Sequence, residues 1–310
     1  MHVVLAGSHG MIGRALTAHL VAEGHRVTRL VRRPVVSPAE ISWDPTAGRL
    51  DPAGLRGVDA VVNLGGAGIG DRRWTAAYQQ RILTSRTVPT SLLARVLADL
   101  APAGAPDGET GPRVLLQASA VGFYGDRGDE LLTEASGPGE GFLVDVVRAW
   151  EGATAPAEQA GVRVAHLRTG IVMSPDGGSF GRLLPLLRLG LGGPLGDGSN
   201  YWAWITLADH VRAIGHLLTS EVRGPVNLTG PEPARQREIV RAVARELHRP
   251  AVLAVPRVAI RAVVGGFADD ILSSQRAVPR VLLDDGFVFR HADVVTAARW
   301  LTQQARAPRR

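Results

Sequence analysis

The chain has 310 residues and a net charge of +6, contains no cysteine, and all 35 residues of its Lys+Arg count are arginine. Disulfides, thiolate nucleophiles, cysteine-based metal sites and mechanisms that need a catalytic lysine are therefore excluded. With 45% hydrophobic and 21% charged residues, the composition is typical of a globular protein. No basic stripe interleaved with aromatics is visible, so we do not expect a nucleic-acid partner.

No apolar run approaches the roughly 20 residues that a membrane-spanning helix needs. The first residues, Met1 to Gly7, run directly into an apolar pattern without the charged segment and small-residue cleavage site of a secretory signal. We therefore expect a cytoplasmic protein without a membrane partner.

The first half of the chain alternates between short apolar runs and segments with helical spacing. Apolar runs bounded by glycine or proline predict strands over residues 2–6, 27–31, 58–64, 114–118 and 162–167, with a short last strand over 226–228. Helical spacing predicts a helix over residues 14–23 and two helical stretches within residues 74–100, separated near Pro89. This alternation predicts an α/β fold with a doubly wound parallel sheet of the Rossmann type.

The second half of the chain is less regular. Residues 101–112 are rich in proline and glycine and are expected to form a surface loop. Beyond Val172 the glycine content rises, and the alternation stops. The predicted elements there are a helix over residues 235–248, a short strand over 252–255 and a last helix over 292–303.

These elements suggest how the chain is divided. We expect a dinucleotide-binding Rossmann domain over residues 1–173, to which residues 204–230 return. Residues 174–203 and 231–310 would form a smaller C-terminal lobe that contributes to a substrate site.

Three glycines follow the first predicted strand and precede the first predicted helix. In a dinucleotide-binding loop, glycine allows the tight turn, the close approach of the backbone to the pyrophosphate, and close packing of helix on strand. The helix N-terminus then faces the phosphates. A tight turn without a ligand is the alternative. The sequence predicts a cofactor-binding loop formed by Gly7, His9, Gly10, Met11, Ile12 and Gly13.

The residues after the second predicted strand indicate which dinucleotide would bind. An acidic residue about 20 positions after the loop would hold the ribose of NAD, but Arg32 and Arg33 stand here, with no carboxylate before Glu40. Arginine binds a 2′-phosphate and stacks on adenine, so we predict NADP, held by Arg32 with help from Arg33 and Arg86. Alternatively, Arg32 and Arg33 are solvated side chains on a loop.

Glycine also follows the strand predicted over residues 58–64. Leu64, Gly65 and Gly66 would let the backbone pass close to the ribose of the nucleotide. On its own this pattern indicates only a turn at a strand end, but together with the glycine loop it supports the cofactor prediction.

Together with motifs along the rest of the chain, these residues resemble the extended short-chain dehydrogenase/reductases, the superfamily of sugar-nucleotide epimerases. More narrowly, the chain is similar to the atypical epimerase-like branch that carries a C-terminal segment of unknown function. The resemblance implies a Rossmann fold, a nicotinamide cofactor and a small-molecule substrate. The matching motifs are Gly7–Gly13, Asn63–Ala67, Arg73-Trp74, Ser85-Arg86, Ser119–Gly125, Trp150-Glu151, Arg168–Gly170, Gly190–Gly196, Trp204–Asp209, Ser274-Gln275 with Pro279, and Gly286–Phe289.

The resemblance places the catalytic serine of the superfamily at Ser119, where it would orient a substrate hydroxyl or carbonyl. The alternative is a serine that caps the end of its strand. The superfamily's Tyr-x-x-x-Lys pair is missing, because Phe142 and Val146 stand in its two places. Tyr124 is then the best remaining phenol, acting as a hydrogen-bond donor with an ordinary pKa of about 10, or else only packing as an aromatic.

Two further patterns are not expected to be functional. Residues 177–181 match the G-x-S-x-G pattern of serine hydrolases, but Ser179 does not directly follow a predicted strand, and the glycines suit a loop. His210 and His216 would lie on different faces of a helix, so no metal site is predicted.

Two functions remain open. The first is an NADP-dependent oxidoreductase or epimerase-like enzyme that acts on a sugar-nucleotide-like or other polar small molecule and lacks the Tyr-x-x-x-Lys pair. The alternative is an NADPH-binding sensor or regulatory protein with little or no catalysis. Ser119 and the glycine-rich segment 190–199 favour the enzyme, whereas Phe142 and Val146 favour the binding protein. No oligomeric state is predicted.

Overall fold

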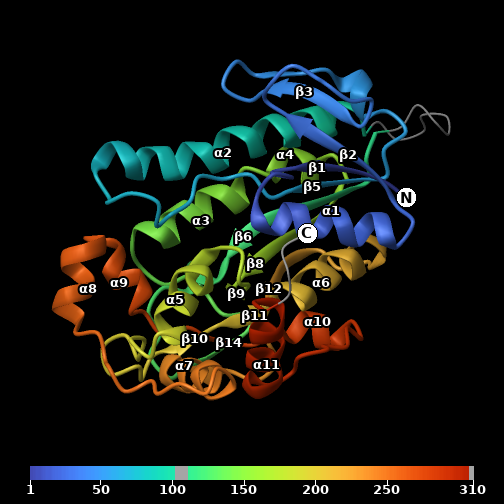
Figure 1. Cartoon of the computed structure of the whole chain (residues 1–310). Coiled ribbons are helices and arrows are strands. Elements are labelled where there is room, and N and C mark those ends of the chain that lie inside the picture. The colour runs from blue at the N-terminus through green and yellow to red at the C-terminus, as the bar shows by residue number, and fades with distance from the viewer. Residues whose placement is uncertain (102–110, 307–310) are drawn as a thin grey trace.

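An eight-stranded sheet forms the centre of the computed structural model, which describes residues 1–101 and 111–306 (Figure 1). The strand order is β12-β8-β6-β5-β1-β2-β3-β4, and neighbours are parallel except for the antiparallel pair β3 and β4. The predicted α/β class is confirmed, and the fold is Rossmann-like. The strands are β1 His2–Ala6, β2 Arg26–Val31, β3 Glu40–Asp44, β4 Arg49–Leu50, β5 Ala60–Asn63, β6 Val114–Ala120, β8 Arg163–Thr169 and β12 Gly224–Leu228.

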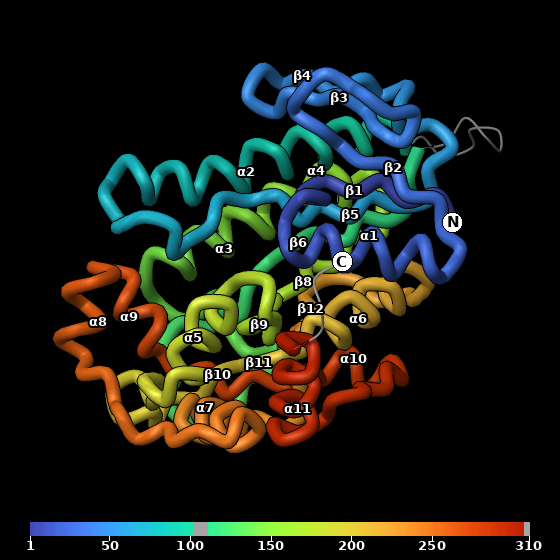
Figure 2. Tube along the Cα trace, in the orientation of Figure 1, coloured from blue at the N-terminus to red at the C-terminus, as the bar shows by residue number. Residues whose placement is uncertain are grey.

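Helices cover both faces of this sheet, as Figures 1 and 2 show. One face packs against α1 Met11–Ala22, α6 Leu207–Thr219 and α10 Arg280–Asp284, and the other against α2 Ala76–Asp99 and α4 Ala155–Gln159. Successive residues of β1 alternate between the two cores, with Val3 and Leu5 in the first and Val4 and Ala6 in the second. Because both faces are buried, the strand sequences are continuously apolar, which is why they could be recognised.

The second predicted helical region forms one continuous helix, so the predicted break near Pro89 is wrong. Proline lacks an N–H group and is unfavourable inside a helix. Here α2 has buried residues both before Pro89, at Ile82, and after it, at Leu93 and Leu97. Packing of Ile82 against α3 and of Leu93 and Leu97 against the sheet therefore outweighs the local preference to break.

The rest of the chain adds short elements and a further apolar core beside the sheet. This core joins Phe180, Ile239 and Leu301 from three different helices. The domain boundaries expected at residues 173, 203 and 230 stay a prediction. The remaining elements are η1 Pro52–Leu55, η2 Val121–Tyr124, β7 Leu131–Leu132, α3 Phe142–Gly152, β9 Ile171–Met173, α5 Gly178–Arg188, β10 Tyr201–Trp202, β11 Trp204–Thr206, β13 Ala234–Arg235, α7 Gln236–Glu246, α8 Arg257–Val264, α9 Phe267–Ile271, β14 Arg276–Ala277 and α11 Val294–Gln304.

Several expectations for loops and short strands need correction. The strand predicted over residues 252–255 does not form, and Val255 makes only an isolated bridge to Leu195. The loop predicted over residues 177–181 is wrong, because α5 begins at Gly178 and buries Phe180 and Leu184 on one face. The strands β3 and β4 were not predicted. Most of the loop predicted over residues 101–112 lies outside the described residues.

No helix among the described residues combines the length and the apolar character that crossing a membrane requires.

Candidate functional site

The carboxyl ends of β1, β5 and β6 meet at one edge of the sheet. Gly7 directly follows β1, Gly65 lies two residues after β5, and Ser119 lies near the end of β6. Ligands of open parallel sheets bind at this edge, so the topology places the predicted glycine and serine residues on the side where a ligand is expected. The strand register aligns Ala6, Asn63 and Gln117.

The glycine loop after β1 turns so tightly that two of its glycines leave no room for a side chain. Gly7 has a φ of +80°, and a Cβ there would lie 2.8 Å from the backbone of Leu64. A Cβ on Gly13 would collide with the carbonyl oxygen of Gly7. Gly10 is the N-cap of α1 and makes no side-chain cap, so the first N–H groups of the helix stay available to an anion.

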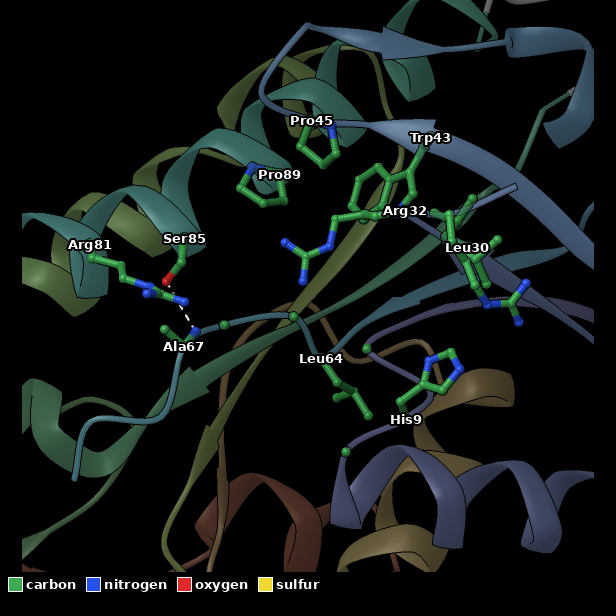
Figure 3. Close-up of a pocket in the computed structure, with 16 residues that line it drawn as sticks. His9, Leu30, Arg32, Trp43, Pro45, Leu64, Ala67, Arg81, Ser85 and Pro89 are labelled. Carbon is green, nitrogen blue, oxygen red and sulfur yellow. Dashed lines mark hydrogen bonds between the residues drawn. The ribbon is translucent and has the colours of Figure 1, made fainter. Parts of the chain in front are cut away.

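A cavity of about 700 Å³ opens in front of this loop (Figure 3). Its volume falls within the range of small-molecule sites. Of the residues predicted to bind the cofactor, it is lined by Gly7, His9, Gly10, Arg32, Arg33, Leu64, Gly65 and Gly66. The predicted residues Met11, Ile12, Gly13 and Arg86 are not among those that line it.

Other lining residues were not predicted from the sequence to bind the cofactor. Trp43 comes from β3, and Arg81, Ser85 and Pro89 come from α2. The spacing of these three α2 residues, four and four, places them on one face of the helix, which is a signal the sequence did contain. The Ser85 hydroxyl accepts a hydrogen bond from the Ala67 N–H at 3.0 Å and so ties the loop after β5 to α2 (Figure 3).

The two adjacent arginines after β2 differ in their electrostatic surroundings. Arg33 donates to both carboxylate oxygens of Glu40, at 3.0 and 2.7 Å, and Arg29 pairs with the same carboxylate at 2.9 Å. The hydrogen bonds from Arg33 and from the Val36 N–H hold the pKa of Glu40 at about 2. Arg32 extends into the cavity (Figure 3) and forms no ion pair with a described residue. Its charge is therefore available to a ligand, whereas that of Arg33 is shared.

Ser119 lies in a buried polar network. Its hydroxyl is 2.6 Å from Glu151, whose carboxylate also receives two hydrogen bonds from Arg168, at 2.8 and 2.9 Å. Burial alone would raise the pKa of Glu151, but the hydrogen bonds and charge of Arg168 hold it below its ordinary value. Because an ionised carboxylate only accepts, Ser119 must donate its hydrogen to Glu151. Toward any other group Ser119 can then only accept a hydrogen bond.

Tyr124 belongs to the same network and is fully buried. Its hydroxyl donates to Asn227 at 2.8 Å and accepts from Arg168 at 3.2 Å. The expectation that Tyr124 has an ordinary pKa is wrong. Arg168 is a cationic neighbour, and burial nevertheless raises the pKa of Tyr124.

The two positions of the missing Tyr-x-x-x-Lys pair face an apolar cluster between α2 and α3. Phe142 meets Trp74 edge to face, with ring centroids 5.2 Å apart. Val146 is 2% exposed and packs with Tyr78 and Ile82. A lysine at position 146 would be surrounded by apolar side chains, without a group that could pair with its charge.

The two remaining sequence patterns can also be placed. Ser179 lies in the first turn of α5, and residues 174–177 separate this helix from β9, so it does not stand on a sharp strand-to-helix turn. Within the described ranges, no three histidine or acidic side chains gather closely enough to hold a metal ion.

Two known protein families match most of the chain. The family described as "NAD dependent epimerase/dehydratase family" matches residues 3–229, and a domain of unknown function, DUF1731, matches residues 255–301. The chain is 44% identical to epimerase family protein Mb2239 of Mycobacterium bovis, over 97% of each chain. It is 35% identical to epimerase family protein SDR39U1 of Bos taurus, over 96% of this chain and 99% of that relative.

Solved structures are also similar to this chain, among them the two that follow. The human epimerase family protein SDR39U1 with NADPH has a TM-score of 0.87 and 31% identity, covering 98% of this chain and 99% of that one. A nucleoside-diphosphate sugar epimerase from Corynebacterium glutamicum has a TM-score of 0.74 and 35% identity, covering 97% of this chain and 58% of that one.

Proposed function

This chain belongs to the NAD dependent epimerase/dehydratase family, and we propose that it is an NADP-dependent oxidoreductase or epimerase-like enzyme. Its substrate would be a sugar-nucleotide-like or other polar small molecule. The observation that carries the proposal is the cavity at the glycine loop, into which Arg32 extends with an unshared charge (Figure 3). The structure of the human relative with NADPH supports the same choice of cofactor.

The lining residues fit a phosphorylated dinucleotide. Gly10 and the N-terminus of α1 would face its pyrophosphate, because the first N–H groups of a helix attract anions. Arg32 and Arg81 would face the 2′-phosphate, and Trp43 would pack against the adenosine. The bound cofactor would supply or accept a hydride. Arg33 would support Arg32 indirectly, since its own charge is shared with Glu40.

Ser119 would act on the substrate as a hydrogen-bond acceptor. Its own hydrogen is committed to Glu151, so the group that it meets must carry an O–H or N–H donor. Of the two groups considered from the sequence, this favours a substrate hydroxyl over a carbonyl. Tyr124 is a positioning residue in this proposal, because its buried hydroxyl contacts Arg168 and Asn227.

The binding-protein alternative has its own support. Phe142 and Val146 pack in an apolar cluster where the superfamily has its acid–base pair. A chain that lost this pair could keep the cofactor as a signal without turning over a substrate. We retain an NADPH-binding sensor or regulatory protein as the second candidate.

We propose further that the protein is cytoplasmic and that its partner is the small-molecule substrate. The chain has a net charge of only +6, and its arginines do not form a stripe with aromatic residues. This distribution supports neither a nucleic-acid nor a membrane partner.

The two candidates are separated by assays in both directions. NADPH oxidation is followed with a panel of carbonyl compounds, and NADP⁺ reduction with the matching alcohols and sugar nucleotides. For an enzyme, we expect turnover that falls about tenfold in Ser119→Ala, the scale of one lost hydrogen bond of about 1.4 kcal/mol. Tight NADPH binding without turnover supports the sensor. Turnover unchanged in Ser119→Ala would show that Ser119 has no part in the reaction.

A further inference from the structure

Arg86 of α2 is a largely buried arginine whose charge no described acidic side chain balances. Its guanidinium carbon lies 5.1 Å from the centre of the Trp150 ring. It also packs against Gly66, where an added Cβ would approach this carbon to 3.3 Å. Within the described residues, its guanidinium donates a hydrogen bond to the carbonyl oxygen of Ile82, at 3.0 Å. Since a guanidinium has five N–H donors, most of its capacity is unused.

Two other buried arginines have more hydrogen-bond partners than Arg86. Arg163 donates three hydrogen bonds to backbone carbonyls, and Arg168 is paired with Glu151 and Tyr124. A buried charge without such partners is unfavourable. Burial accordingly lowers the pKa of Arg86 to about 10, which still leaves it charged at neutral pH. An anion bound at Arg86 would supply the missing partner.

The unused donors of Arg86 are open to a ligand. Across residues 1–101 and 111–306, the side-chain nitrogen and oxygen atoms that are both inaccessible to solvent and without a hydrogen-bond partner belong to Glu134, His210, Gln236 and Arg276. The unused donors of Arg86 are not among them, so they keep some exposure to solvent. Its neighbours Gly66 and Ser85 line the cavity at the glycine loop, although Arg86 itself does not. Its ring partner Trp150 is on α3, next to Glu151. Arg86 therefore lies between the cavity and the helix that holds Ser119 in place.

We propose that Arg86 binds an oxyanion, a phosphate or a carboxylate, at a position distinct from the 2′-phosphate position at Arg32. The planar guanidinium would hold two oxygens of this group at once. The oxyanion comes either from the diphosphate of the dinucleotide or from an acidic group of the substrate. The choice between these sources rests on the proposed function, but the anion-binding role of Arg86 does not.

The test is calorimetric titration of NADPH, NADH and inorganic pyrophosphate into wild type and Arg86→Gln. Arg95→Gln is the matched control, because Arg95 is exposed on the same helix. If the source is the dinucleotide, Arg86→Gln weakens NADPH and NADH by the same factor of about ten or more. Pyrophosphate then does not bind the NADPH complex. If the source is the substrate, neither dinucleotide is weakened, and pyrophosphate binds the NADPH complex of wild type but not that of Arg86→Gln.

Two results would overturn the proposal. One is unchanged affinity of Arg86→Gln for all three ligands, and the other is a loss for NADPH alone, which would assign Arg86 to the 2′-phosphate. If Arg86→Gln does not fold, Arg86→Lys replaces it. This variant keeps the charge but not the planar guanidinium, so we expect a smaller loss of ligand affinity. If wild type binds neither dinucleotide, the proposed function fails, while pyrophosphate titration into the unliganded variants still tests Arg86.

Discussion

The two ends of the site differ in how their charged side chains are satisfied. At the glycine loop, Arg32 and Arg81 line a cavity without an acidic partner among the described residues. At Ser119, by contrast, Glu151 and Arg168 neutralise each other inside a closed network. An unpaired charge beside a cavity can bind a ligand, whereas a satisfied network mainly fixes its own members. One sheet edge therefore combines an open end with unpaired arginine charges and a closed end whose charges neutralise each other.

The largest effect is expected from placing a charge in the apolar cluster. Val146→Lys restores half of the superfamily pair but buries an ammonium group at a position that is 2% exposed. We expect unfolding in urea to become easier by about 3–5 kcal/mol. Val21→Lys, at a position that is 58% exposed, should change stability by less than about 0.5 kcal/mol. A Val146→Lys protein of unchanged stability would mean that this position is more open than the cluster indicates.

A somewhat smaller loss is expected when the closed network is broken. Glu151→Ala leaves Arg168, whose side chain is 5% exposed, without its counter-ion. We expect a destabilisation of about 3 kcal/mol in urea unfolding. Asp284→Ala removes the matched surface pair with Arg280, in which the side chains are 58% and 68% exposed, and should cost less than about 1 kcal/mol. Equal losses in the two variants would show that the Ser119 end is not a closed network.

The same network predicts a pH dependence. Although burial opposes it, Arg168 holds the pKa of Glu151 below the ordinary value of 4.5. This stabilisation is complete above the pKa of the unfolded chain and is lost as the pH falls through the lower pKa of the folded protein. The stability difference between wild type and Glu151→Gln should therefore shrink below about pH 4.5 in urea unfolding. A difference that grows on acidification would contradict the pairing with Arg168.

The smallest effect concerns the shared arginine at the glycine-loop end. Arg33→Ala should lower the affinity for NADPH by less than about 1 kcal/mol, because Glu40 already holds this guanidinium. Arg32→Ala is the matched variant one position away and should cost more. Titration of NADPH into the two variants checks the order, and a larger loss in Arg33→Ala would reverse the roles assigned to them.

The sequence could predict the open end of the site better than the closed end. The glycine loop and Arg32 are read from short spacings within the first strand–helix–strand unit, β1–α1–β2, and the parallel topology places Gly65 on the same edge. Trp43 and Arg81 were missed because they reach the cavity from separate elements. The partners of Ser119 and Tyr124 lie 32 and 103 residues away along the chain, and spacing patterns carry no such information.

We propose that the unpaired charge of Arg32 at the glycine loop determines the choice of cofactor. The most direct measurement is calorimetric titration of NADPH and NADH into wild type and Arg32→Glu. We predict that wild type binds NADPH more tightly than NADH by about 1.5–3 kcal/mol, the scale of a hydrogen bond to a charged group. In Arg32→Glu this preference should disappear or reverse, while the affinity for NADH is kept. Equal affinities of wild type for the two dinucleotides would contradict the account.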